Sequence, residues 1–468
     1  MADKKTKGET LKEKLFYEKK HIAKLLTDEQ AKQAEKFSKE YREFLNKAKT
    51  ERETIEYTVS SLKKAGFSEF VYGQRYAAGD KVYYINKGKS LIAAVYGNES
   101  PDSGLSILAA HIDSPRIDLK QVPLYESSEL AYFKTHYYGG IKKYQWPTIP
   151  LALHGVFAKK DGTKVTVSIG EEPNDPVFVI TDLLPHLADE QMKRPAGKII
   201  AGEELNLLIG SLPFKDDKAS ELVKLNILSL LNDKYGIDEA DFLSAELEAV
   251  PAFAAKEVGF DRSLIGGYGQ DDRVCAFTAL KAALDIKETP DKTLLVVLAD
   301  KEEIGSTGNT GLDSSFLKYF VADLCEPYGV AARHALTNSL CLSADVNAGF
   351  DPTFPDVLEK NNASFVNYGV VATKFTGRGG KYGTSDASAE TVASVRKIFD
   401  DNKIVWQTGE LGKVDLGGGG TVALYIAGLG ADVIDIGVPV LSMHSPYELT
   451  SKYDVYMTYL AFKAFVKR

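Results

Sequence analysis

The sequence has 468 residues and a hydrophobic fraction of 44%, which allows a sizeable core and exceeds what one core usually holds. Its 57 Lys and Arg residues against 65 Asp and Glu residues give a net charge of −8, which disfavours binding to nucleic acids or anionic membranes. The first residues lack the apolar core typical of a secretory signal, and no later run is long enough to span a bilayer. Cys275, Cys325 and Cys341 are odd in number and widely spaced, which does not suggest a disulfide framework. We therefore expect a cytoplasmic protein with two domains, or one large domain carrying an insertion.

Residues 10–64 are rich in Lys, Glu, Ala and Leu, with apolar positions at helical spacing before the break at Gly66. This pattern predicts amphipathic helices whose charges form a solvated face. From Phe67 onward, short apolar runs bounded by turns predict strands, as in KVYYIN (81–86), SLIAAVYG (90–97) and SILAAHIDSP (106–115).

The segment between about residues 123 and 254 differs from the sequence on either side of it. It has alternating strand-like stretches and one helical portion at 220–233. We expect residues 122–254 to be an inserted β-rich domain, and residues 1–121 and 255–468 to form a catalytic domain. After the insertion, helical segments alternate with continuous apolar strands such as TLLVVLAD (293–300). Such strands are typical of an α/β fold, so we predict a mixed central sheet with helices on both faces.

Polar side chains follow several of these predicted strands at their carboxyl ends, where open α/β sheets bind ligands. His111 and Asp113 project to the same face of an extended chain, so one can bind a metal while the other fixes the imidazole. A satisfied core histidine, with the Asp forming a turn before Ser114 and Pro115, is the commoner explanation of such a pair alone.

Two pairs of adjacent carboxylates follow. Asp271 and Asp272 precede a predicted helix, where they can cap its first turn as well as bind a metal. Glu302 and Glu303 stand at the end of the apolar strand, which allows one to ligate a metal while the other handles a proton of water.

Asp345 and His444 also follow predicted strands, and each alone reads as a turn residue. Taken together, His111, Asp271, Glu303, Asp345 and His444 form an oxygen- and imidazole-rich set without thiolates, which suits paired Zn²⁺, Mn²⁺ or Co²⁺. The glycine run 417–420 lacks the phosphate-loop pattern and indicates close backbone approach or a tight turn.

The motifs QDDR, DKEEIGS, SADVNAG and SMHSPYE resemble those of the aspartyl aminopeptidase and aminopeptidase I family of zinc metallopeptidases. Within that family, the stretch YGQDDR (268–273) is more similar to aminopeptidase I. The resemblance covers roughly residues 72–465. It implies two divalent ions per subunit, with zinc expected and manganese or cobalt as alternatives. It assigns His111, Glu303, Asp345 and His444 as ligands, Asp271 as the bridging ligand, Glu302 as the general base and Asp113 as the supporting acid.

The resemblance also implies that the insertion is a dimerisation domain and that subunits assemble into a tetrahedral dodecamer. His186 in LLPHLADE would then reach a neighbouring subunit's active site, although without the family it is a surface loop residue. Arg378 and Lys381 in FTGRGGKYGTSDAS are candidates for contact with an acidic substrate side chain. Acidic and neutral first residues both remain open as substrates.

We therefore expect a metal-dependent aminopeptidase that removes the first residue of short peptides with a water activated by two metals. A two-metal phosphoesterase is disfavoured by the negative charge and by the missing phosphate loop. A non-catalytic peptide-binding or cargo assembly protein on the same scaffold is the alternative from a different class, and its signature would be a lost ligand or base.

Overall fold

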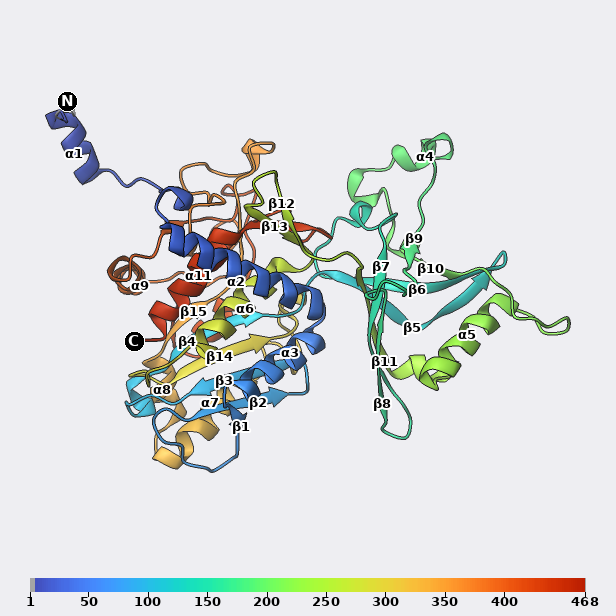
Figure 1. The fold of residues 1–468 in the computed structure, drawn as a ribbon, viewed down its shortest axis with the longest axis horizontal. Coiled ribbons are helices and arrows are strands. Elements are labelled where there is room, and N and C mark those ends of the chain that lie inside the picture. The colour runs from blue at the N-terminus through green and yellow to red at the C-terminus, as the bar shows by residue number, and fades with distance from the viewer. Residues whose placement is uncertain (1–4, 468) are drawn as a thin grey trace.

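The computed structural model describes residues 5–467; residues 1–4 and 468, the two ends of the expected catalytic domain, lie outside that range. The described chain forms two lobes (Figure 1). The larger lobe contains a nine-stranded sheet, here called the central sheet, and a five-stranded sheet, the small sheet. The smaller lobe contains a seven-stranded sheet, the outer sheet. The α-helices are α1 (Lys7–Leu15), α2 (Asp28–Lys47), α3 (Glu51–Lys64), α4 (Asp189–Met192), α5 (Leu222–Tyr235), α6 (Gln270–Leu284), α7 (Phe316–Cys325), α8 (Ala332–Thr337), α9 (Ala389–Asp401), α10 (Ala423–Ala427) and α11 (Lys452–Phe465).

The central sheet is mixed, as the sequence predicts. In spatial order its strands are β1 (Ser68–Glu69), β2 (Lys81–Asn86), β3 (Ser90–Val95), β14 (Leu294–Ala299), β4 (Ser106–His111), β15 (Leu340–Ser343), β19 (Asp432–Gly437), β17 (Val370–Thr373) and β18 (Trp406–Thr408). The strands from β14 to β19 are parallel neighbours, whereas β3 and β17 flank them in the antiparallel direction.

Helices cover both faces of the central sheet, which confirms the predicted fold class. Leu108 of β4 and Val296 of β14 belong to the core beneath α2, α6 and α11. The next residue along each strand, Ala109 and Val297, belongs to the opposite core beneath α7 and α10. Because successive side chains point to opposite faces, a strand buried on both sides must be apolar throughout, which explains the continuous apolar runs.

The N-terminal region forms the expected amphipathic helices. α2 begins with a capping box between Thr27 and Gln30. Phe37 and Phe44 of α2 pack on Phe277 of α6, with ring centroids 5.4 and 5.1 Å apart. α1 projects away from the larger lobe and has no buried residue (Figure 1).

The outer sheet is antiparallel and has its own core, which includes Trp146 and Phe157. In spatial order its strands are β8 (Lys164–Ile169), β7 (Leu151–Ala158), β11 (Ala245–Pro251), β5 (Arg116–Ser127), β6 (Leu130–Tyr138), β10 (Leu207–Gly210) and β9 (Val179–Ile180). β5 begins before residue 122, the expected start of the inserted domain, and crosses that boundary.

The small sheet contains β12 (Lys256–Val258), β13 (Leu264–Gly267), β21 (Glu448–Ser451), β20 (Pro439–Leu441) and β16 (Asn347–Ala348). β13 leads into the start of α6, and β20 leads into the loop that carries His444. This sheet therefore connects two of the segments from which the predicted site residues come.

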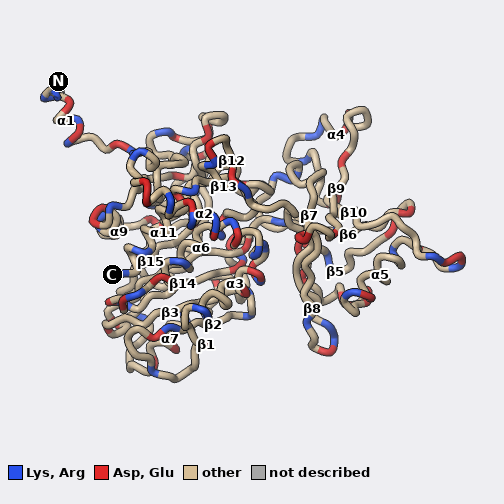
Figure 2. The backbone as a smooth tube through the Cα atoms, viewed as in Figure 1, with Lys and Arg blue, Asp and Glu red and all other residues tan. Residues whose placement is uncertain are grey.

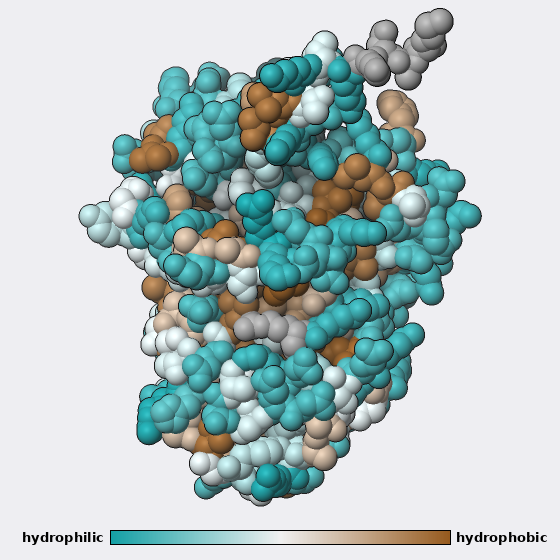
Figure 3. All heavy atoms as spheres, turned by 90° about the vertical axis from the view of Figure 1, so that its left-hand side faces the viewer, coloured by the Kyte–Doolittle hydropathy of each residue, from teal (hydrophilic) through white to brown (hydrophobic). Residues whose placement is uncertain are grey.

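Charges of both signs are interspersed over both lobes (Figure 2). The face of the larger lobe that lies on the left in Figure 1 is mostly hydrophilic, and its apolar patches are separated from one another (Figure 3). Among the described residues, no helix combines the length and apolarity needed to cross a bilayer.

Candidate metal centre

Three neighbouring strands of the central sheet place polar side chains at one edge. His111 is the last residue of β4, Glu302 and Glu303 lie in the short turn after β14, and Asp345 follows β15. Because β14, β4 and β15 are parallel neighbours, their carboxyl ends lie side by side.

Asp271 and His444 reach the same edge from outside the central sheet. Asp271 stands at the start of α6 with φ −80° and ψ 108°, so it precedes the regular helix. His444 follows β20 with φ 63°, in the left-handed region. The structure thus brings together all five predicted metal ligands.

The carboxylate of Asp271 lies between the two imidazoles. Its Oδ1 is 3.2 Å from His111 Nε2, and its Oδ2 is 3.1 Å from His444 Nε2. A carboxylate that turns one oxygen toward each histidine has the geometry of a bridging ligand.

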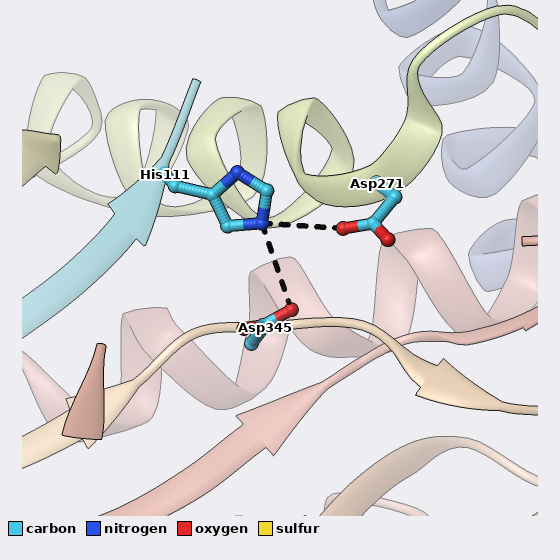
Figure 4. Close-up of side chains that lie close together, drawn as sticks. All are labelled: His111, Asp271 and Asp345. Atoms are coloured by element: carbon cyan, nitrogen blue, oxygen red, sulfur yellow. Dashed lines mark ion pairs between the residues drawn. The ribbon is translucent and has the colours of Figure 1, made fainter. Parts of the chain in front are cut away.

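Two groups of possible ligands share Asp271. One contains His111, Asp271 and Asp345, and the other contains Asp271, Glu303 and His444; within each, the ligand atoms lie within 4.8 Å of one another. Figure 4 shows His111 of the first group pointing its ring nitrogen at both carboxylates. A further group joins His111 to Glu302 and Glu303 within the same limit.

These residues fit divalent cations. Glu303 Oε1 is buried and has no hydrogen-bond partner among the described residues. Burial and then the charge of Asp271 raise the pKa of Glu303 well above its usual range, and burial likewise raises the pKa of Asp345. These carboxylates lie close together with little positive charge nearby. Cations bound between them would supply the positive charge that stabilises their ionised forms.

Glu302 differs from the five predicted ligands in its surroundings. Burial raises the pKa of Glu302 to about 7, against the opposing charge of His111. Its Oε2 is 3.9 Å from His111 Nε2, and its side chain is 17% exposed. A carboxyl group with a pKa near neutrality at the edge of a buried site can take up and release protons.

Asp113 orders the residues around it. His111 Nδ1 lies 3.0 Å from the backbone oxygen of Asp113, so an N–H donated there leaves Nε2 free to ligate. The Asp113 carboxylate accepts the backbone N–H groups of Glu302 and Glu303 at 3.1 and 3.2 Å. It also accepts the Tyr138 hydroxyl at 2.8 Å. Asp113 thereby connects the ends of β4 and β14.

A cavity of about 490 Å³ opens over these side chains. Its lining includes Met443, Leu411, Leu424 and the glycines 418–420, and within residues 5–467 it contains no Lys or Arg. A Cβ at Gly418 would lie 2.5 Å from the Gly377 oxygen, so the glycine run permits the close backbone approach that the sequence indicates. A larger groove of about 940 Å³ lies elsewhere, between the N-terminal segment and α9, and has none of the described metal-ligand groups.

The three predicted substrate contacts lie outside this cavity lining. His186 is exposed in a short turn (Pro185–Leu187) of the smaller lobe. Lys381 Nζ lies 2.9 Å from Asp386 Oδ2, and the backbone of Arg378 pairs with that of Tyr382. The loop that carries Arg378 and Lys381 borders the cavity through Thr376 and Gly383. Their contact with substrate stays a prediction.

Two residues at the site have no predicted role in the sequence. Glu448 accepts hydrogen bonds from the backbone of Asp271 and of His444, and its place in SMHSPYE, four residues after His444, was an available signal. Tyr138 falls in the segment assigned to the insertion, and no local pattern marks it.

Comparison with known proteins identifies the family of this chain. The family model described as aminopeptidase I zinc metalloprotease (M18) matches residues 44–466. A protein of Clostridium acetobutylicum named "Probable M18 family aminopeptidase 1" is 50% identical over 447 residues, which cover 94% of this chain and 96% of that protein.

Solved structures agree as well. The crystal structure of aminopeptidase I from Clostridium acetobutylicum has a TM-score of 0.92 at 46% identity, covering 97% of this chain and 100% of that one. An M18-family aminopeptidase from Thermotoga maritima gives a TM-score of 0.92 at 45% identity, with the same coverage of both chains. The chain therefore belongs to the aminopeptidase I (M18) family of zinc metalloproteases.

Proposed function

We propose that this chain is a two-metal aminopeptidase that removes the first residue of short peptides in the cytoplasm. The observation that carries the proposal is the carboxylate of Asp271, which lies between His111 and His444 with Glu302 beside them. Family membership supports the coarser part, a metal-dependent aminopeptidase.

The donor sets divide into two ion subsites. His111 and Asp345 would hold one ion, His444 and Glu303 the other, and Asp271 both. When bound, the ions would supply Lewis acidity and lower the pKa of the attacking water. The imidazole and carboxylate donors suit zinc, with manganese or cobalt as alternatives.

Glu302 is the proposed general base. Its carboxylate accepts a proton from the attacking water and delivers it to the leaving amine. Asp113 holds the backbone of Glu302 in place during this transfer, because its oxygen accepts the Glu302 N–H at 3.1 Å.

Activity against aminoacyl anilides tests the proposal. Purified protein should release N-terminal amino acids, lose this activity to a chelator and regain it with zinc, manganese or cobalt. No turnover across all aminoacyl substrates with any of these metals would contradict it.

We further propose a preference for uncharged first residues. The cavity lining offers Met443, Leu411, Leu424 and Val346 to a substrate side chain, but no Lys or Arg from the described part of the chain to pair with an acidic one. Comparing leucyl, methionyl, aspartyl and glutamyl anilides tests this preference. Faster turnover of the acidic substrates, lost selectively in Lys381→Ala or Arg378→Ala, would instead favour the two basic residues as substrate contacts.

We also propose a homo-oligomer, a tetrahedral dodecamer, in which residues 122–254 form the dimer contact and His186 reaches a neighbour's cavity. The solved structure of the S. cerevisiae mApe1 dodecamer shares this fold at 24% identity and a TM-score of 0.76. Support from this chain comes from α5, in which only Val223 is buried while Leu230 is 57% exposed. An exposed apolar helix face of this kind is characteristic of protein contacts.

A further inference from the structure

Glu448 is a buried carboxylate that touches two proposed metal ligands through their backbones. It is the first residue of β21 and is 1% exposed. Its Oε1 accepts the backbone N–H of His444 at 2.7 Å, and its Oε2 accepts that of Asp271 at 3.0 Å. None of the described metal-ligand groups includes Glu448, and it does not line the cavity.

The two residues that Glu448 joins meet at one ion subsite. Asp271 Oδ2 and His444 Nε2 are 3.1 Å apart, although the two residues come from distant parts of the chain. Bonding both backbones to one rigid carboxylate fixes the distance between the segments that carry these side chains. Each of its two oxygens accepts one backbone N–H group, so a single side chain joins the two segments directly.

His444 particularly needs such support. Its φ of 63° lies in the left-handed region, which residues other than glycine rarely adopt unless neighbours hold them there. Glu448 holds its backbone N–H, while the Gly140 oxygen lies 2.8 Å from its Nδ1. Together these contacts orient Nε2 toward Asp271.

Glu448 itself is anchored to the strand before Asp271. It pairs with Gly267 of β13, and its backbone oxygen accepts a hydrogen bond from Gln270 Nε2 at 2.6 Å. Gln270 Nε2 also donates to the Ile265 oxygen at 3.1 Å. The carboxylate is therefore held on the same framework that presents Asp271.

We propose that Glu448 is a positioning residue that sets the affinity of the ion subsite formed by Asp271, Glu303 and His444. The inference rests on the proposed two-metal function. The subsite of His111 and Asp345 shares Asp271 but not His444, so a change at Glu448 acts mainly on one of the two ions.

The test is a zinc titration of chelator-treated full-length protein by calorimetry, with bound metal measured on the same samples. Glu448→Gln preserves the size of the side chain but replaces one acceptor oxygen with an amide donor facing a backbone N–H. We expect two zinc equivalents in the wild type. In Glu448→Gln, one equivalent should bind about 10–100-fold more weakly, and the other should be nearly unchanged.

Asp454 of α11 provides a matched control. It is also buried, and its two oxygens accept the backbone N–H groups of Asn367 and Gly369 at 2.6 and 2.7 Å. Asp454→Asn makes the same chemical change away from the cavity lining. It should lower the thermal unfolding midpoint, as Glu448→Gln can, while both zinc affinities stay at the wild-type values.

Glu448→Asp is the second variant, for the case that Glu448→Gln does not fold. The carboxylate, shortened by one methylene, cannot reach both N–H groups, so the same equivalent should weaken. Wild-type affinities in either Glu448 variant, or equal zinc loss in Asp454→Asn, would overturn the inference. A wild type that binds two equivalents but cleaves no aminoacyl anilide would contradict the proposed function and leave the role of Glu448 in ion binding intact.

Discussion

Glu302 and Glu303 are neighbours in sequence, yet the site gives them different surroundings. Glu303 belongs with Asp271 and His444, whereas Glu302 stands beside His111 at the partly exposed edge. Glu302→Gln should lower kcat by about 10²–10⁴ and leave two metal equivalents bound, because only proton transfer is lost. Glu303→Gln should lose one equivalent. Steady-state kinetics with metal analysis checks both, and the reverse pattern would exchange the two roles.

Asp113 is expected to control metal affinity without binding a metal. Its carboxylate accepts from Glu302 N, Glu303 N and the Tyr138 hydroxyl, so the amide in Asp113→Asn leaves at least one of these donors unpaired. We expect zinc affinity to fall by about 10–100-fold in Asp113→Asn. Tyr138→Phe removes a single donor and should have a smaller effect. Equal zinc affinities of Asp113→Asn and the wild type would contradict this role.

The sequence predicts which residues form the site, but not the contacts that hold these residues in place. Each proposed ligand follows a strand-like run or begins a helix, and such patterns are local in the chain. The 3.1 Å approach of Asp271 to His444, and the hydrogen bonds from their backbones to Glu448, depend on the pairing of β13 with β21. Pairing between distant strands has no signature in a single sequence.

At the level of helices and strands, a cluster of one histidine and two glutamates links the two lobes. His154 of β7 lies 2.6 Å from Glu53 of α3 and 3.0 Å from Glu171, which follows β8. Burial lowers the pKa of His154, but the two carboxylates outweigh burial and raise the pKa from 6.5 to about 9. A raised folded-state pKa means that this contribution to stability is complete below about pH 6.5 and is lost as the pH rises through about 9.

His154→Gln therefore should destabilise the protein most at acidic and neutral pH. The loss expected at pH 6 is about 1.5–3 kcal/mol, the usual contribution of a hydrogen bond to a charged group. The difference from wild type should shrink between pH 7 and pH 10. Thermal unfolding midpoints of both proteins across this range test the prediction, and a difference independent of pH would contradict it.

Elements with long apolar runs are predictable, whereas their assignment to sheets is not. TLLVVLAD yields β14 because both faces of that strand are buried. The run VIDIGVPVLSMHS (433–445) instead divides into β19 of the central sheet and β20 of the small sheet. The chain leaves β19 at Gly437, where a Cβ would lie 1.6 Å from the Asp345 oxygen. Strands as short as β12 and β16 carry no periodic pattern at all.

For the whole molecule, the proposed assembly makes activity depend on contacts made by the smaller lobe. Leu212, Phe214, Leu225 and Leu230 are exposed there, and Leu212 lies beside α5, where its backbone oxygen accepts from Asn226. Each buried leucine contributes about 1.5–3 kcal/mol to an interface, so Leu225→Glu with Leu230→Glu should dissociate it. Light scattering would then report a smaller particle than the wild type.

The same double variant separates assembly from metal binding. If His186 of one subunit contacts substrate in another, dissociation should lower kcat/KM to the level of His186→Ala while both metal equivalents remain bound. Tyr319→Glu changes an exposed apolar residue on α7 of the larger lobe and serves as the control, with wild-type mass and activity expected. A wild type that is monomeric and fully active, or a dissociated variant with undiminished kcat/KM, would remove the trans role of His186. The reaction would then need no residue of a neighbouring subunit, because the five proposed ligands and Glu302 all lie within one chain.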